Sequence, residues 1–139
     1  MSIQILNKNL ELQKIVIQSV KNIEYLKEKH ISIHSSIPSR TIMPYIKLVS
    51  LSLNNNPIGD LKTFTIDLFV ATNGKNNREL LEIMENIYDN ISSSINNYLA
   101  TNDDISCAIH NIYNLKYSIQ EDLQNSVWNG HFYFDVDLI

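Results

Sequence analysis

The chain has 139 residues, 44% of them hydrophobic and 19% charged, which is typical of one globular domain that is long enough to bury a core. A formal net charge of −4 argues against nucleic acid as the main partner, because phosphate binding needs a basic surface. No apolar run reaches the roughly 20 residues that cross a bilayer, the N-terminus lacks a secretory signal, and the single Cys107 fits a reducing compartment.

The first predicted element is one uninterrupted helix from about Gln4 to Lys29, a stretch without glycine or proline. Its apolar residues recur at three-and-four spacing, which places them on one stripe that we expect to pack on a sheet. The residues of this stripe are Leu12, Ile15, Val16, Ser19, Val20, Ile23 and Leu26.

Three strands are predicted next, at His30–Ile37, Pro44–Leu53 and Thr63–Thr72. The apolar phase of the second strand slips between Leu48 and Leu51, which predicts a bulge near Val49. In the third strand, alternate apolar residues face one way, and Phe69 falls on the polar side. There it could cover a neighbouring side chain or meet another subunit.

A second helix is predicted from about Asn77 to Leu99, with Asn76 as its cap and Glu79 completing a capping box. Ile105 to Ile119 reads as extended, and the polar segment Gln120–Ser126 reads as a loop. The final strand runs from Trp128, and its residues alternate between an apolar face with Phe132, Phe134, Val136 and Leu138 and a polar face with Asn129, His131, Asp135 and Asp137. A glycine inside it, Gly130, suggests a bulge or a close approach of another backbone.

These elements predict a single α+β domain, residues 1–139, in the order α-β-β-β-α-β-β. Short links and alternating strands favour a mainly antiparallel sheet with both helices packed on one face.

The chemistry-bearing residues form no recognisable site in the sequence. His30 and His34 are too far apart along a strand to share a metal, and Cys107 and His110 fall on opposite faces of theirs. Asp135 and Asp137 share a polar strand face, which we interpret as solvated. We therefore predict no catalytic, cofactor-binding or metal-binding residues and no enzymatic activity.

Several segments together resemble a family of small tail-completion proteins, the tail terminators of long-tailed phages, prophages and gene transfer agents. The resemblance rests on the N-terminal amphipathic helix, the strand opening Pro44-Tyr45-Ile46, the Thr63–Thr72 strand followed at once by a helix, and the segment Gln120–Val136. It covers about residues 4 to 139.

The resemblance implies an α+β subunit that forms a ring, often hexameric and in some cases only on the end of the tail tube. Such a ring stops tube growth and joins the tail to the head and neck proteins. The implied partners are therefore copies of this chain, the major tail tube protein and a head-completion protein. It implies assembly in the bacterial host cytoplasm, then a place at the head–tail junction, without cofactor, membrane or sequence-specific nucleic acid.

A ring subunit needs two different surfaces that meet when copies are rotated about one axis, and a third surface for the tube. Off-phase apolar residues and loop residues are the candidates for these surfaces. They are Asn55, Ile58, Asp60, Phe69, Asp103 and Asp104.

Two other functions stay open on the sequence. One is a head-completion or stopper protein of the neck, which has a similar size and composition. The other is a small host enzyme or ligand-binding domain, which would need a pocket such as one around Tyr113, Tyr117 and Tyr133.

Overall fold

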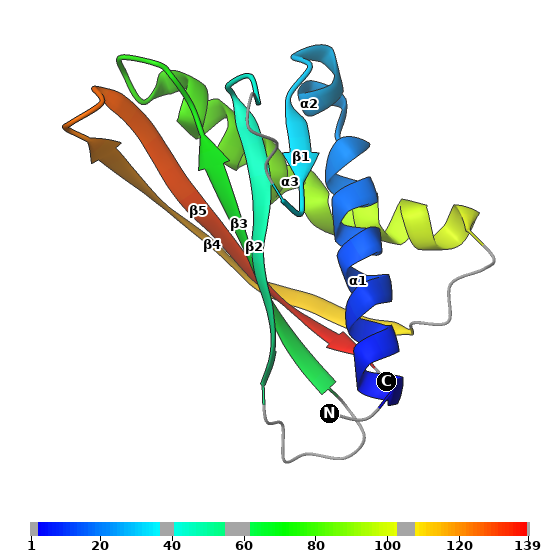
Figure 1. Ribbon diagram of the computed structural model, residues 1–139. Coiled ribbons are helices and arrows are strands. Elements are labelled where there is room, and N and C mark those ends of the chain that lie inside the picture. The colour runs from blue at the N-terminus through cyan, green and yellow to red at the C-terminus, as the bar shows by residue number, and fades with distance from the viewer. Residues whose placement is uncertain (1–2, 37–40, 55–61, 103–107, 139) are drawn as a thin grey trace.

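The computed structural model describes residues 3–36, 41–54, 62–102 and 108–138, with the backbone alone for 3–7 (Figure 1). The helices are α1 (Ile3–Lys21), α2 (Glu24–Glu28) and α3 (Arg78–Thr101). The strands are β1 (Ser32–His34), β2 (Tyr45–Asn54), β3 (Lys62–Ala71), β4 (Ile109–Asp122) and β5 (Val127–Leu138). Apart from the short α2, this is the predicted order, and the α+β fold class is confirmed.

The five strands form one sheet in the order β1-β2-β3-β5-β4. β1 pairs in parallel with β2, and every other pair is antiparallel, as predicted. Figure 1 shows α3 crossing behind the sheet and α1 lying against α3. Among the described helices, none combines the length and apolarity that spanning a membrane requires.

The core lies between the sheet and the two long helices. Across β3 and β5, Phe64 faces Val136, Ile66 faces Phe134, and Leu68 faces Phe132. All six side chains are fully buried, because alternation along each strand sends them to the helix side. Helix α1 contributes residues of its predicted stripe, among them Leu12, Ile15, Val16 and Val20. The buried residues of α3 are Leu80, Ile83, Met84, Ile87, Ile91 and Ile95.

The prediction of a single first helix is wrong, because the chain breaks after Lys21 and restarts at Glu24. Ile23 has an extended backbone, with φ −66° and ψ 122°. Both Ile23 and Leu26 are nevertheless buried. The break turns α2 so that its apolar side chain still reaches the core, a tertiary gain that outweighs local helix preference.

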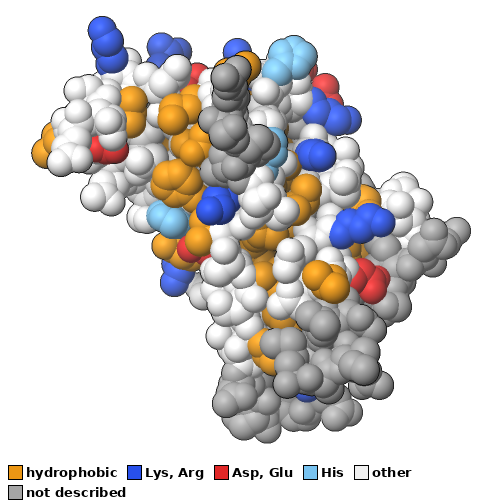
Figure 2. Space-filling model, in the orientation of Figure 1, with side chains coloured by type: hydrophobic (Ala, Val, Ile, Leu, Met, Phe, Trp, Pro, Cys, Tyr) orange, Lys and Arg blue, Asp and Glu red, His pale blue; other side chains and the backbone are white. Residues whose placement is uncertain are grey.

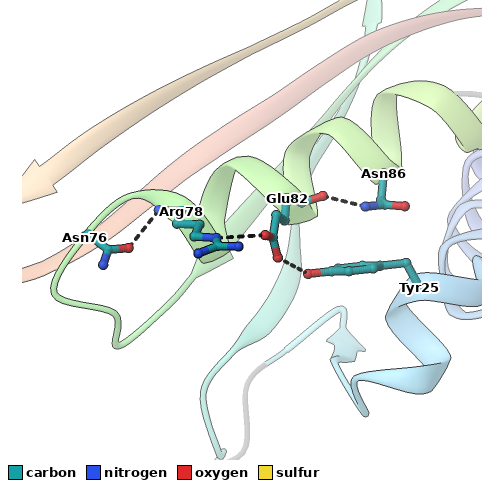
Figure 3. Close-up of polar contacts among 5 residues, drawn as sticks. All are labelled: Tyr25, Asn76, Arg78, Glu82 and Asn86. Carbon is teal, nitrogen blue, oxygen red and sulfur yellow. Dashed lines mark hydrogen bonds and ion pairs between the residues drawn. The ribbon is translucent and has the colours of Figure 1, made fainter.

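Helix α2 is tied to α3 by a tyrosine–glutamate contact (Figure 3). The Tyr25 hydroxyl donates to Glu82 Oε2 at 3.0 Å, and Arg78 Nε lies 3.3 Å from Glu82 Oε1. Burial raises the pKa of Tyr25 to about 12, and the hydrogen bond to Glu82 adds to the increase. The hydrogen bonds from Tyr25 and Arg78 lower the pKa of Glu82.

A tyrosine pKa raised by folding predicts alkaline instability. The neutral phenol stabilises the fold fully below its unfolded pKa of 10.0, and this contribution is lost as the pH rises towards about 12. We expect Tyr25→Phe to lose less stability than the wild type between these values. Urea denaturation midpoints measured at both ends of the window test this, and two parallel pH profiles would contradict it.

The predicted capping box at α3 is only half present. The Asn76 side chain accepts a hydrogen bond from the Arg78 N–H at 3.1 Å, although the backbone places the cap at Asn77. Glu79 Oε1 is buried and has no hydrogen-bond partner, so it does not close the box. A polar pair at the right spacing is therefore not sufficient here, because the turn before the helix sets the cap one residue later.

Two strand boundaries differ from the prediction. Within the described part of the predicted strand His30–Ile37, residues 30–36, β1 covers Ser32–His34, and His30 before it has a positive φ of 55°. The predicted loop Gln120–Ser126 is shorter in the structure, because β4 continues through Asp122. Residues 123–126 form the tight turn of the β4–β5 hairpin. The bulge predicted near Val49 is confirmed by the register shift between Leu48 and Ser50.

The alternation in the sequence predicts that Tyr113 shares a strand face with Leu115, Tyr117 and Ile119, and this is wrong for Tyr113. The pairing of β4 with β5 shifts register twice, between Ile109 and Asn111 and between Tyr113 and Lys116, and each shift changes which side chains face the helices. As a result Ile112 and Leu115 pack on the core, whereas Tyr113 lies opposite Asp135 on the other face. Asn114 makes the second bulge possible, since it has a φ of 58°, a conformation that asparagine tolerates better than most residues.

Candidate interaction surfaces

The uncovered face of the sheet carries the predicted interface residue Phe69. Phe69 and His131 meet edge to face with ring centroids 5.2 Å apart, and His131 stacks on Tyr133 at 5.7 Å. Lys116 Nζ lies 5.9 Å from the centre of the Tyr133 ring. These four side chains form a continuous row over β3, β5 and β4, which we call the aromatic row. Phe69 thus covers a neighbour, one of the two roles predicted for it.

The polar residues beside this row are bonded to one another. His131 Nδ1 lies 2.7 Å from Asp67 Oδ1. Asp135 accepts hydrogen bonds from Thr65 Oγ1 at 2.7 Å and Asn114 Nδ2 at 3.0 Å. The carboxylates on this face are therefore engaged in holding neighbouring strands together.

The prediction of a solvated Asp135–Asp137 pair is wrong for Asp137, which is only 8% exposed. Its Oδ1 accepts from the Thr63 hydroxyl at 2.7 Å and from the Tyr113 hydroxyl at 3.0 Å. Burial raises the pKa of Tyr113, and the bond to Asp137 raises it further. Sequence reasoning missed this contact because a bulge in β4, which the apolar pattern does not show, brings Tyr113 to this face.

The three tyrosines that could have marked a ligand pocket lie on two different faces. Tyr117 packs on the helix side and stacks on Phe132 at 6.4 Å, whereas Tyr113 and Tyr133 face away from the helices. A hollow of about 230 Å³ beside Tyr133 is lined by Thr65, Asn114, Lys116 and Asp135. The arrangement does not bring the three phenols together.

Most of the other candidate residues lie outside the described part of the chain, and the remaining histidines are at its surface. Asn55, Ile58, Asp60, Asp103, Asp104 and Cys107 lie outside the described residues. His34 is bonded to Ser32 Oγ at 2.9 Å, and His110 is exposed on β4. Within the described ranges, no three His, Cys, Asp or Glu side chains lie close enough together to bind a metal ion.

Two exposed apolar residues were missed by the sequence reasoning. Leu123 in the β4–β5 turn is 79% exposed, and Ile42 before β2 is 84% exposed. Figure 2 also shows hydrophobic side chains gathered in a band along the middle of the visible face. An apolar residue within a polar loop was the signal used for Ile58, and the same signal applies to Leu123. Single exposed apolar residues are common on protein surfaces, whereas a contiguous apolar patch is typical of a contact surface.

The comparisons with known proteins give a likeness of fold. No protein-family model matches the sequence, and neither does any curated protein. A solved chain from the virion of a native gene transfer agent particle has a similar structure, with a TM-score of 0.57 at 10% sequence identity. The likeness covers 91% of this chain and 93% of that chain, so the two share their fold over nearly their whole lengths.

Proposed function

We propose that this chain is a structural protein of virion assembly that acts as a tail terminator. In this role it caps the tail tube as a ring, joins the tube to the head and transforms no molecule. The main support is the fold shared with a component of a gene transfer agent virion along nearly the whole of both chains. The segments Pro44-Tyr45-Ile46, Thr63–Thr72 and Gln120–Val136, which resemble tail terminators, support it separately.

The described surface suits a protein that acts by docking. The aromatic row is uncovered, and the carboxylates of Asp67, Asp135 and Asp137 form hydrogen bonds within the same face. Leu123 and Ile42 expose apolar area at the two sides of the sheet. A net charge of −4 also fits a ring through which DNA passes without being held by phosphate attraction.

The partners in this proposal are five further copies of the same chain in a six-membered ring, as in the tail terminators that it resembles, the major tail tube protein and a head-completion protein. Assembly takes place in the bacterial host cytoplasm, and the ring then occupies the head–tail junction.

Tube growth in the presence of the purified protein tests this function. A major tail tube protein from the same source is polymerised with substoichiometric amounts of this protein, and tube lengths are measured by electron microscopy. We expect shorter tubes as more protein is added, because each ring blocks one growing end. Unchanged lengths would contradict the proposal, and binding to the portal end of filled heads instead would identify a stopper protein.

A further inference from the structure

The turn between β4 and β5 presents a rigid apolar tip. The Asp122 carboxylate accepts hydrogen bonds from the backbone N–H groups of Gln124 and Asn125, at 3.2 and 3.3 Å, and from Asn125 Nδ2 at 2.8 Å. These bonds lower the pKa of Asp122, with the Asn125 side chain as the largest cause. Leu123 projects from this ordered turn, and Glu121 is exposed beside it. We call residues 121–126 the hairpin tip.

A hollow of about 550 Å³ lies at the opposite edge of the sheet, between the end of α2, β1 and the start of β2. Its lining combines apolar side chains with basic ones and contains no carboxylate among the described residues. We call it the β1 hollow, and its lining residues are Lys29, His30, Ser32, His34, Thr41, Ile42, Met43 and Pro44.

The tip and the hollow lie at the same end of the sheet. One row of paired residues crosses four strands, from Tyr45 through Ala71 and Asn129 to Gln120. The residues that line the hollow include Pro44, next to Tyr45, and the tip begins at Glu121, next to Gln120. Figure 1 shows the start of β2 and the β4–β5 turn at the same end of the sheet. They are separated across the sheet by β3 and β5, roughly 15–20 Å at the usual strand spacing, so they cannot meet within one chain.

The two surfaces are complementary in chemistry. The tip carries an exposed leucine and acidic side chains, whereas the hollow offers apolar lining with Lys29, His30 and His34. A head-to-tail contact requires two different surfaces, and here they lie at opposite edges of the sheet and at the same end of it. Such contacts form a closed ring when the rotation between neighbouring copies returns to the first copy.

We propose that Leu123 at the hairpin tip of one copy inserts into the β1 hollow of the next copy, with Glu121 facing Lys29. This inference rests on the proposed function, since it names the contact by which the ring closes. The rigid turn favours the contact, because little conformational entropy remains to be lost when Leu123 docks.

Disulfide trapping tests the contact directly. In a Cys107→Ser background, the single variants Leu123→Cys and Ile42→Cys are mixed in equal amounts and mildly oxidised, alone and with the tube protein. We expect a heterodimer as the main product of the mixture. The double variant should give a ladder of covalent oligomers that ends at the closed ring, because each copy then carries both halves of the contact.

The matched control places the cysteine on α1, with Leu10→Cys in place of Leu123→Cys, since Leu10 is 55% exposed. Trapping no greater than in this control, both with and without tube protein, would overturn the contact. Trapping of Leu123→Cys to the tube protein instead would also overturn it.

The tube-growth assay separates this inference from the function. If the Cys107→Ser protein shortens tubes, and the variants Leu123→Cys and Ile42→Cys in that background are not trapped, the terminator role is kept and the contact is refuted. A protein that is trapped as a ladder but leaves tube length unchanged supports the contact and removes the terminator role.

Discussion

Replacing Phe132 with alanine is expected to lower the free energy of unfolding by about 3–5 kcal/mol, the range for deleting a buried aromatic side chain. Phe132 is fully buried, and its ring contacts those of Tyr88, Tyr117 and Phe134 at centroid distances of 6.1 to 6.4 Å. The substitution therefore opens a cavity where β5, β4 and α3 meet. Urea denaturation followed by circular dichroism measures the loss.

The adjacent residue supplies the control for this substitution. Tyr133 lies on the uncovered face, where it stacks on His131, so Tyr133→Ala should cost only about 1 kcal/mol. Equal losses for the two variants would show that the helices do not pack on the face assigned to them.

Gly130→Ala is expected to destabilise the fold by about 1–3 kcal/mol, although it adds a single methyl group. A Cβ at this position would lie 2.3 Å from the Ser118 carbonyl oxygen and 2.9 Å from Met84 Cε. The first neighbour is backbone, so β4 must move away from β5 to make room. The loss of stability is measured by the same urea titration.

Gly74→Ala is the matched control for this effect. Among the described residues, a Cβ there would lie within 4 Å of one atom, the Asn76 carbonyl oxygen at 3.2 Å, so a small change is expected. If both alanine variants behaved alike, the close approach of β4 at Gly130 would be refuted. The glycine in the last strand was predicted from the sequence to mark such an approach, and the distance to Ser118 confirms it.

Side-chain alternation made the sheet predictable. Phe64, Ile66, Leu68 and Val70 are buried as a set, and so are Phe132, Phe134 and Val136. When helices cover one face of a sheet, alternate residues of each strand are buried. The positions of the apolar residues in the sequence therefore predict which side chains face the core. The same reasoning placed Phe69 on the uncovered face.

The errors occur where distant contacts override a local pattern. The break between α1 and α2 at Ile23 has no glycine or proline to mark it, and it follows from packing Leu26 into the core. The bulges in β4 depend on its pairing with β5, which no single strand shows. Asp137 was therefore taken as solvated, because its partners Thr63 and Tyr113 are 74 and 24 residues away in the chain.

The candidate surfaces were less predictable than the fold. Leu123 was assigned to a long polar loop, whereas β4 and β5 extend to a short turn that holds it at a tip. The β1 hollow is assembled from α2, β1 and the start of β2, so its lining depends on three elements packing together. Exposed apolar residues inside polar segments remain the sequence signal that could have found it.

Electron microscopy of tube ends tests whether this chain works by docking in a ring. Tubes polymerised with the protein are imaged in vitreous ice, and their ends are averaged. We expect one ring of additional density at a single end of each tube, with neighbouring subunits joined through Leu123 and Ile42. Bare tube ends with the protein remaining in solution, or density along the tube wall, would contradict it.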